Sequence, residues 1–105
     1  MTLWEVSTAT PTESDARALA RSAVQAGLAA GAQVEGPVGS VFVHQGEYGE
    51  GQEWRVSLMT SEARRVALQG HLVECHVWEN PQVTWRELGA SDGCADWVER
   101  VTRAD

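Results

Sequence analysis

The residues best suited to chemistry in this sequence lie together between positions 75 and 85. A thiol and an imidazole are adjacent at Cys75 and His76, and the carboxylate of Glu79 follows beside the indole of Trp78. Thiol and imidazole groups are ligands that suit soft or borderline metal ions such as copper and zinc. A carboxylate beside an indole can lose its hydration and act as a general acid or base near neutral pH. The segment therefore suggests either a metal site or proton-transfer chemistry.

Two hypotheses assign roles to these groups. For catalysis, Glu79 is the general acid or base, and His76, three residues earlier, is its partner. For a metal, the candidate ligands are His76, Cys75 and His44. Neighbouring residues of a strand point to opposite faces, so Cys75 and His76 would not easily chelate one ion by themselves. A bound ion would need His44, His71 or a second subunit, and the plainer alternative for each residue is packing, a salt bridge or exposure.

The candidate ligand-binding residues are Trp78, Trp85, His44 and Arg55. Indoles form apolar pocket walls with one hydrogen-bond donor each, and the two tryptophans flank the bend expected at Pro81. His44 is expected at the end of a long strand, and Arg55 on a sheet face of mixed polarity. The remaining tryptophans are expected to pack in the core and between subunits: Trp4, Trp54 and Trp97.

The segment 75–85 itself is predicted to be extended. Val77, Val83 and the tryptophans favour strands. Pro81 has no N–H to donate and belongs at an edge, a bulge or a break. We therefore predict two short strand pieces joined by a kink, with polar side chains pointing out of the bend.

The N-terminal part predicts a strand followed by a helix. Alternation over residues 3–8 indicates a half-buried strand. Thr12 is the expected N-cap of the helix, and Gly31 is its expected stop. One apolar stripe recurs at helical spacing and consists of Ala16, Leu19, Ala20, Ala23, Val24 and Leu28.

The middle of the chain predicts a long hairpin and a second helix. Extended runs cover about 34–45 and 54–59, with a bulge or bend at Gly36–Pro37. Thr60 or Ser61 can cap the following helix. The residues expected on one face of that helix are Ala63, Val66, Ala67 and Gly70.

The predicted order is β-α-β-β-α-β, followed by a short C-terminal helix that carries Trp97. This order is typical of the α+β class and of the ferredoxin-like fold, an antiparallel sheet with both helices on one face. The other face carries residues as varied as Arg55, Ser57 and Met59. An uncovered sheet face on a small domain favours self-association.

Composition limits the classes of partner. The 105 residues have the length of a single domain (1–105), and the formal net charge is -7 with no lysine. Nucleic acids and anionic membranes both require basic surfaces, so neither is expected as a partner. No signal-like or membrane-spanning run is visible, so a cytoplasmic location and free thiols at Cys75 and Cys94 are expected. Arginine in place of lysine, with much alanine and glycine, suggests a bacterial genome of high GC content.

Several segments, in the same order, resemble the CutA family of divalent-cation-tolerance proteins. His76-x-aromatic-Glu79-x-Pro81-x-Val83 is similar to the family signature His-Pro-Tyr-Glu-Val-Pro-Glu-Ile. The resemblance extends from Ser7 to Val101. The other similar segments and positions are Ser7-Thr8-Ala9-Thr10-Pro11, Leu28-Ala29-Ala30, Pro37-Val38-Gly39-Ser40, Gly46, Glu53, Thr60 and Trp97.

The resemblance implies a homotrimer in which strands of neighbouring subunits pair, with clefts between subunits. It also implies a loosely defined role in metal tolerance, with a divalent metal or copper as the ligand. The chain departs from the family at metal-capable and polar groups, since the family cysteine is Gly31 and the lysine before Thr60 is Met59. Further departures are Gln33, Phe42, His44, Val77-Trp78, Gln82 and Cys94.

Two functions are consistent with these observations. In the first, a divergent CutA-like trimer binds a metal ion or a small molecule in a cleft between subunits, in a regulatory role. In the second, the scaffold is an enzyme of a specialised bacterial pathway, in which Glu79 and His76 transfer protons on an apolar substrate held by Trp78 and Trp85. Glu79→Gln would abolish turnover in the second case and leave the trimer intact. No phosphate-binding loop or GxSxG motif favours ATP hydrolysis or acyl transfer.

Overall fold

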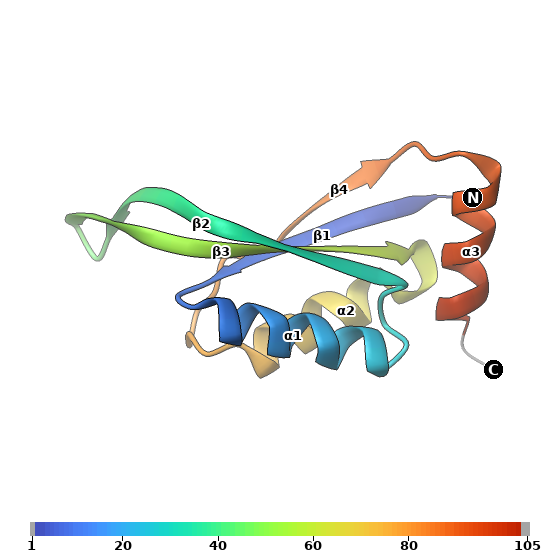
Figure 1. Ribbon diagram of the computed structural model, residues 1–105, viewed down its shortest axis with the longest axis horizontal. Coiled ribbons are helices and arrows are strands. Elements are labelled where there is room, and N and C mark those ends of the chain that lie inside the picture. Colours follow the sequence, from blue (N-terminus) through green and yellow to red (C-terminus); the bar gives the residue numbers. More distant parts are fainter. Residues whose placement is uncertain (1, 104–105) are drawn as a thin grey trace.

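The computed structural model describes residues 2–103, which form a four-stranded antiparallel sheet and three helices (Figure 1). The predicted α+β, ferredoxin-like order is confirmed. The residues 1, 104 and 105 of the predicted domain lie outside the described part. The strands lie in the spatial order β2-β3-β1-β4, so β2 and β4 are the edges. The elements are β1 (Leu3–Thr10), α1 (Glu13–Gln25), β2 (Gly31–His44), β3 (Glu47–Ser61), α2 (Glu62–Cys75), β4 (Thr84–Leu88) and α3 (Asp92–Thr102).

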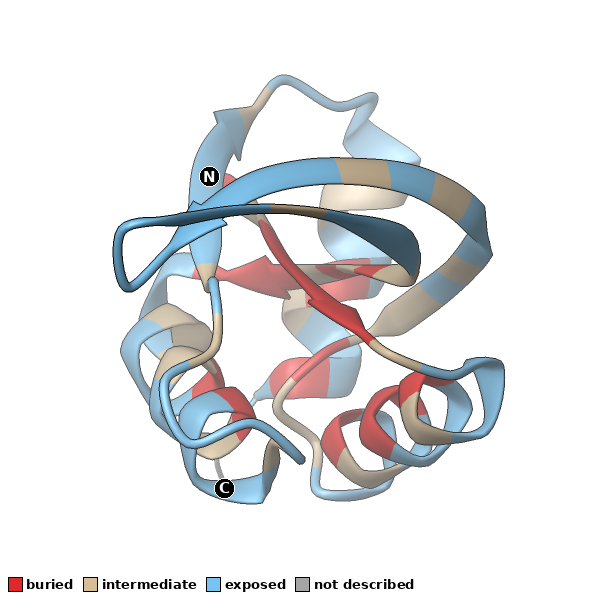
Figure 2. Ribbon diagram, turned by 90° about the vertical axis from the view of Figure 1, so that its left-hand side faces the viewer, coloured by how far each residue is buried: buried red, intermediate tan, exposed pale blue. Residues whose placement is uncertain are grey.

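Helices α1 and α2 lie on one face of the sheet, as predicted, and the core fills the space between them and the strands (Figures 1 and 2). Val6 and Leu58 are register partners on β1 and β3, and both point towards the helices. They meet Leu68 and Leu72 of α2, and all four side chains are fully buried. Full burial of a leucine contributes about 1.5–3 kcal/mol. Alanines on α1 let that helix approach closely: Ala16, Ala20 and Ala23.

The ends of α1 are set by local backbone chemistry. The N–H of Asp15 donates to Oγ1 of Thr12 at 3.0 Å, which confirms the predicted N-cap. The helix ends at Gln25, and Gly27 follows with φ +74°, a conformation that glycine adopts without a steric penalty. Gly31, the predicted stop, is instead the first residue of β2, so this prediction was wrong.

Strands β2 and β3 form a long twisted hairpin whose outer half, residues 38–52, extends past the helices; we call it the hairpin tip (Figure 1). The register shifts between Glu35 and Val38, which confirms the bulge predicted at Gly36–Pro37. Glycine is needed at position 36, because a Cβ there would lie 2.5 Å from the ring of Trp54. The radius of gyration is 14.2 Å, above the value of about 13 Å for a compact chain of this length. The hairpin tip accounts for this elongation.

Helix α2 departs most from the prediction. The expected core face at Ala63, Val66, Ala67 and Gly70 is exposed or nearly so. Leu68 and Leu72 are buried instead, because their larger side chains remove more apolar area from water. Because Leu72 anchors another turn in the core, the helix continues to Cys75. Residues 76–83 are irregular and β4 starts only at Thr84, so the strand predicted for the first half of 75–85 was wrong.

Helix α3 covers one end of the opposite sheet face. Val98 is fully buried, and the ring of Trp97 lies over Gly31, where a Cβ would be 3.2 Å away. The Cys94 thiol donates to the Met59 sulfur at 3.8 Å. The rest of this face carries a polar row in register across all four strands: Gln33, Ser57, Ser7 and Thr84. Among the described helices, none is long and apolar enough to cross a bilayer.

Candidate functional site

His76 holds the 76–83 loop against β1. The backbone N–H of Trp78 donates to Nδ1 of His76 at 3.0 Å, so the ring proton must be on Nε2. Nε2 donates to the carbonyl of Ala9 at 2.9 Å and lies 3.1 Å from Oγ1 of Thr8. The indole of Trp78 stacks on the imidazole, with ring centroids 5.5 Å apart. Both ring nitrogens are engaged, and the imidazole fixes the path of the loop.

Glu79 is exposed on the same loop. Within residues 2–103, no hydrogen bond or ion pair joins Glu79 to His76. A general base needs a free lone pair within reach of the proton that it removes. His76 would have to release Trp78 or Ala9 to transfer a proton, and the catalytic pair therefore remains a prediction.

Cys75 lies beside a different imidazole from the one expected. Residues four apart share one side of a helix, and Nδ1 of His71 is 4.0 Å from the Cys75 sulfur. On its other side, Nε2 of His71 is 2.8 Å from Oγ of Ser22 on α1. The expectation that Cys75 and His76 lie on opposite faces of a strand was wrong, because Cys75 is the last residue of α2 and His76 follows it as the C-cap.

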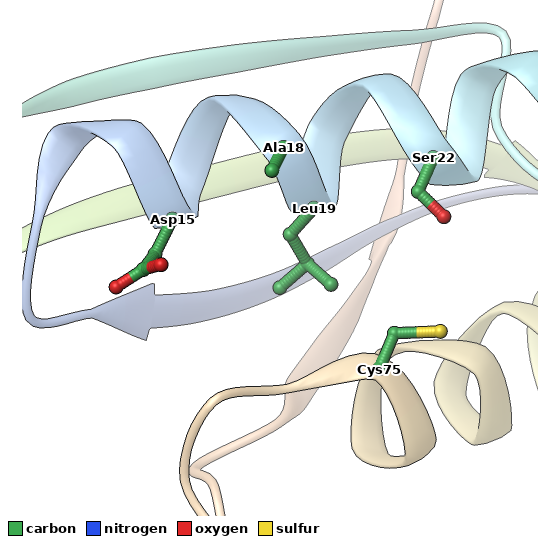
Figure 3. A pocket seen from close by; sticks show the side chains of 5 residues that line it. All are labelled: Asp15, Ala18, Leu19, Ser22 and Cys75. Carbon is green, nitrogen blue, oxygen red and sulfur yellow. The ribbon is translucent and has the colours of Figure 1, made fainter.

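A small cavity of about 150 Å³ separates the two helices at this point (Figure 3). Ser22 points from α1 towards α2, and the sulfur of Cys75 lies on the opposite side of the gap. The lining residues are Asp15, Ala18, Leu19, Ser22 and Cys75. Among the described residues, no group of three or more histidine, cysteine, aspartate or glutamate side chains is placed to hold a metal ion. The predicted set of His76, Cys75 and His44 is therefore not assembled within one subunit.

A second, open groove runs between α2 and the chain that leads into β4. Its volume is about 530 Å³, and most of its walls are apolar. Trp85 is the register partner of Val6, so its indole is on the α2 side of the sheet, where it is 48% exposed. The apolar and small residues of α2 that remain outside the core form one wall of this groove. Its lining residues are Val66, Gln69, Gly70, Val73, Glu74, Pro81, Val83 and Trp85.

Three buried N–H groups at or near this groove have no hydrogen-bond partner within residues 2–103: Trp4 Nε1, Arg65 Nε and Gln69 Nε2. The guanidinium of Arg65 lies over the Trp4 ring at 4.3 Å, and Gln69, which lines the groove, follows Arg65 by one helical turn. The Glu62 carboxylate is 3.5 Å from Arg65 Nε and makes an ion pair without a hydrogen bond. An unpaired buried donor costs about 1–3 kcal/mol. Because all three groups are donors, a hydrogen-bond acceptor brought into this region could satisfy them.

Known proteins place the chain in a family. Residues 5–101 match the family model described as CutA1 divalent ion tolerance protein. The chain belongs to the CutA1 family. CutA from Synechococcus elongatus PCC7942 is 30% identical to this CutA1 chain, with a TM-score of 0.90 over 97% of this chain and 91% of that one. A search of curated proteins finds no match.

More distant CutA1 structures share the fold. CutA1 from Ehrlichia chaffeensis has a TM-score of 0.91 at 22% identity and covers 97% of this chain and 96% of its own. The periplasmic divalent cation tolerance protein CutA from Archaeoglobus fulgidus has a TM-score of 0.90 at 16% identity, covering 98% and 100%. The predicted family resemblance is confirmed.

Of the predicted ligand-binding residues, only Trp85 lines the groove in this CutA1 chain. Trp78 stacks on His76, and Arg55 lies between Ala9 and Glu35 in the register of the sheet. His44 lies in the hairpin tip and pairs with Glu47. The roles of these three residues remain predictions.

The unpaired donors were not recognised from the sequence. The sequence did contain a signal for donors beside an apolar surface. Arg65 and Gln69 are four residues apart, so they lie on one side of the helix, and each is followed by an apolar or small residue, Val66 or Gly70. The position of Trp4 beneath Arg65 depends on how β1 lies against α2. Sequence spacing does not report that contact.

The hairpin tip carries a tyrosine whose phenolic pKa is shifted by a neighbouring carboxylate. The hydroxyl of Tyr48 donates to the Glu50 carboxylate at 2.6 Å. This bond holds the phenolic proton and raises the pKa of Tyr48 above its ordinary value of 10.0. The pair places a tyrosine hydroxyl and a carboxylate among exposed valines.

Proposed function

We propose that this CutA1 protein is a homotrimeric ligand-binding protein with a regulatory role. In this proposal, the groove between α2 and β4 becomes a cleft between subunits when a second copy packs beside it. The ligand is a small molecule with an apolar body and an acidic, hydrogen-bond-accepting group. The observation that carries the proposal is the set of unpaired donors of Trp4, Arg65 and Gln69 at or near apolar walls.

Exposed apolar surface on the hairpin tip supports association between copies. Val41 and Val43 are 66% and 73% exposed, and Tyr48 is 67% exposed. A two-stranded ribbon is marginally stable in water by itself, so covering these side chains would stabilise the tip. The strand β4 is an edge of the sheet and offers unpaired backbone groups to a neighbouring strand. In the proposed assembly, one copy therefore supplies its apolar hairpin tip and another copy supplies the open edge of its sheet at β4.

The chemistry of the groove supports an acidic ligand. Apolar walls such as Val73 and Trp85 favour an aliphatic or aromatic body. The Arg65 and Gln69 donors favour a carboxylate or similar acceptor, and a hydrogen bond to a charged group contributes about 1.5–3 kcal/mol. A ligand of this class would satisfy groups that the chain alone leaves unpaired.

Native mass spectrometry on protein prepared without added metal tests the assembly. We expect a trimer for the wild type and a monomer for Val43→Glu, because the substitution places a charge on apolar contact surface. Val101→Glu is the matched control, since Val101 is an exposed valine on α3. The proposal fails if the wild type is a monomer at micromolar concentration.

Fluorescence of 8-anilinonaphthalene-1-sulfonate, an aromatic anion, tests the groove. We expect binding to the trimer that Gln69→Leu weakens about tenfold or more, because one donor to the anionic group is lost. Val73→Asp should abolish binding, and Val101→Asp should leave it unchanged. Equal binding by all of these variants would place the probe elsewhere and reject the cleft.

The proton-transfer alternative makes a different prediction for Glu79. Under the ligand-binding proposal, Glu79→Gln leaves both the trimer and the binding of the probe unchanged. Loss of a chemical turnover in this variant, with an intact trimer, would favour the enzyme. A cytoplasmic location and the absence of nucleic-acid and membrane partners also remain predictions.

A further inference from the structure

A thiol, an imidazole and a hydroxyl form a chain of contacts between α2 and α1. The Cys75 sulfur is 4.0 Å from Nδ1 of His71, and Nε2 of the same ring is 2.8 Å from Oγ of Ser22. When Nε2 donates its proton to the Ser22 hydroxyl, Nδ1 keeps a lone pair for the thiol. A nucleophile, its base and a third group that orients the base are the arrangement that activates cysteine in enzymes, and the first contact is often long until a substrate binds.

The cavity beside the thiol has room for a small reactant. Its volume is about 150 Å³, and an engineered protein cavity of about this size binds benzene, so about five or six non-hydrogen atoms fit. Leu19 and Ser22 point from α1 towards α2, and the Cys75 sulfur lies across the gap (Figure 3). Ala18 adds further apolar surface. A reactant in this cavity therefore meets the sulfur, one hydroxyl and apolar side chains.

The charge around the pair stabilises a cation and disfavours an anion. Cys75 is the last residue of α2, where the helix dipole is negative, and no lysine or arginine lies in the last turn. Asp15 lines the cavity, and Glu74 precedes the thiol. A resting thiolate gains nothing from these groups, whereas an imidazolium at His71 is stabilised by them. The thiol is therefore expected to pass its proton to His71 only as it attacks a reactant.

These features narrow the chemistry of the thiol. Acyl transfer develops an oxyanion that N–H donors must stabilise, whereas the C-terminal end of a helix presents carbonyl groups. A disulfide within the chain would require Cys94, whose thiol instead donates to the Met59 sulfur beneath α3. The site is better suited to an uncharged reactant that takes the proton back. A carbon–carbon double bond conjugated to a carbonyl group is such a reactant, and it is a soft electrophile that matches soft, polarisable sulfur.

We propose that Cys75 is a nucleophile that captures a small, uncharged α,β-unsaturated carbonyl compound, with His71 as the proton carrier and Ser22 as a positioning residue. The sulfur bonds to the β-carbon while Nδ1 of His71 takes the thiol proton. The π electron pair of the double bond moves towards the carbonyl group, and the imidazolium then returns the proton to the α-carbon. The product is a neutral thioether, and no oxidant or other reactant is needed.

Reaction with but-3-en-2-one, followed by mass spectrometry of the intact protein and its peptides, tests this site. We expect the first adduct at Cys75, formed at least about tenfold faster than at the same thiol in urea-unfolded protein. His71→Gln should slow this reaction about a hundredfold, as is typical for the loss of a general base. Ser22→Ala should slow it by up to about tenfold, through the loss of one neutral hydrogen bond, and Ser22→Thr should restore the rate.

The pH profile separates a proton carrier from a structural residue. An imidazole ordinarily titrates at lower pH than a thiol, so the wild-type reaction should persist to lower pH than that of His71→Gln. The rate at Cys94 in the same molecules is the internal control and should be equal in all variants. A wild type no faster than the unfolded chain, or the same rate and pH profile in His71→Gln, would overturn the proposal.

Ala18→Leu tests whether the reactant enters the cavity. The larger side chain should slow addition at Cys75 at least about tenfold, because displacing reacting groups by about 1 Å can cost about a hundredfold in rate. Ala63→Leu is the matched control, since Ala63 is exposed near the start of α2, and it should leave the rate unchanged. Equal rates in Ala18→Leu and the wild type would mean that the thiol reacts from solvent alone, and the capture site would be rejected.

Discussion

The strands β2 and β3 pass through two different environments in one continuous hairpin. Near the helices, β3 contributes Val56 and Leu58, which are completely buried under α1 and α2. In the hairpin tip, the same pair of strands presents Val41, Val43 and Tyr48 to solvent. Strand-forming side chains occur in both halves, yet only one half has a second layer to cover it.

The two halves show that the tendency of a sequence to form strands is separate from the stability that those strands gain by burial. The covered half draws its stability from apolar area removed from water. The hairpin tip keeps its pairing through cross-strand hydrogen bonds and gains little from burial within the subunit. Its apolar side chains are therefore available to another copy.

The largest loss of stability is expected when a core side chain in the covered half of the hairpin is shortened. Leu58→Ala should lower the free energy of unfolding by about 2–5 kcal/mol, because it leaves a cavity in the core. Val41→Ala should change it by less than about 0.5 kcal/mol, as for other exposed positions. Both are measured by urea unfolding in the Val43→Glu background, where the proposed association is removed. Equal losses at the two positions would mean that the hairpin tip is packed within the subunit.

A smaller loss of stability is expected from a substitution in the 76–83 loop, where His76 binds the loop to β1. His76→Ala removes the bonds to Trp78 and Ala9 and should cost about 1–3 kcal/mol. Hydrogen exchange of the 76–83 amides should increase at the same time. His44→Ala in the hairpin tip is the control and should stay within about 0.5 kcal/mol of the wild type. An equal response from both variants would contradict the anchoring role of His76.

The N-cap of α1 should contribute about 1 kcal/mol to the free energy of unfolding. Thr12→Ala removes the acceptor for the Asp15 N–H, and losses of about 0.5–2 kcal/mol are typical of such changes. Thr12→Ser keeps the hydroxyl and should restore most of the stability. Thermal or urea unfolding of the pair measures the difference, and a Thr12→Ser variant as weak as Thr12→Ala would point to the lost methyl group instead.

The smallest effect concerns titration in the hairpin tip. Tyr48 is the only tyrosine, so absorbance near 295 nm reports its ionisation alone. The bond to Glu50 raises the pKa of Tyr48 above 10.0, and Glu50→Gln should lower it. Because the pKa is raised on folding, the associated stabilisation is present below about pH 10 and is lost as the pH rises through the folded value. An unchanged midpoint in Glu50→Gln would contradict this pairing.

Much of the fold was predictable because its signals are local. Thr12, the alternation of β1 and the break at Gly36–Pro37 each act through their own backbone or immediate neighbours. The end of α2 was not predictable in this way. Gly70 was expected on the core face of this helix, but it lies on an open face, and Leu72 anchors the helix in the core beyond it.

The candidate sites show the same division. The sequence identified Cys75 and His76 as chemical groups, and the strand-forming residues that follow them predicted a strand. Only the packing of α1 on α2 brings Ser22 to His71, and only the length of α2 turns Cys75 towards that ring. These residues are far apart in sequence, so neither propensity nor periodicity reports their contact.

The order of the elements, the ferredoxin-like plan and membership of the CutA1 family could all be inferred from the sequence. These depend on turn chemistry, on hydrophobic periods and on motifs that are read along the chain. Tertiary structure decided which face of α2 is buried, which imidazole lies beside the thiol and which donors remain without an acceptor. The physical reason is that burial and hydrogen bonding are settled between elements, by competition for a shared core and a limited set of partners.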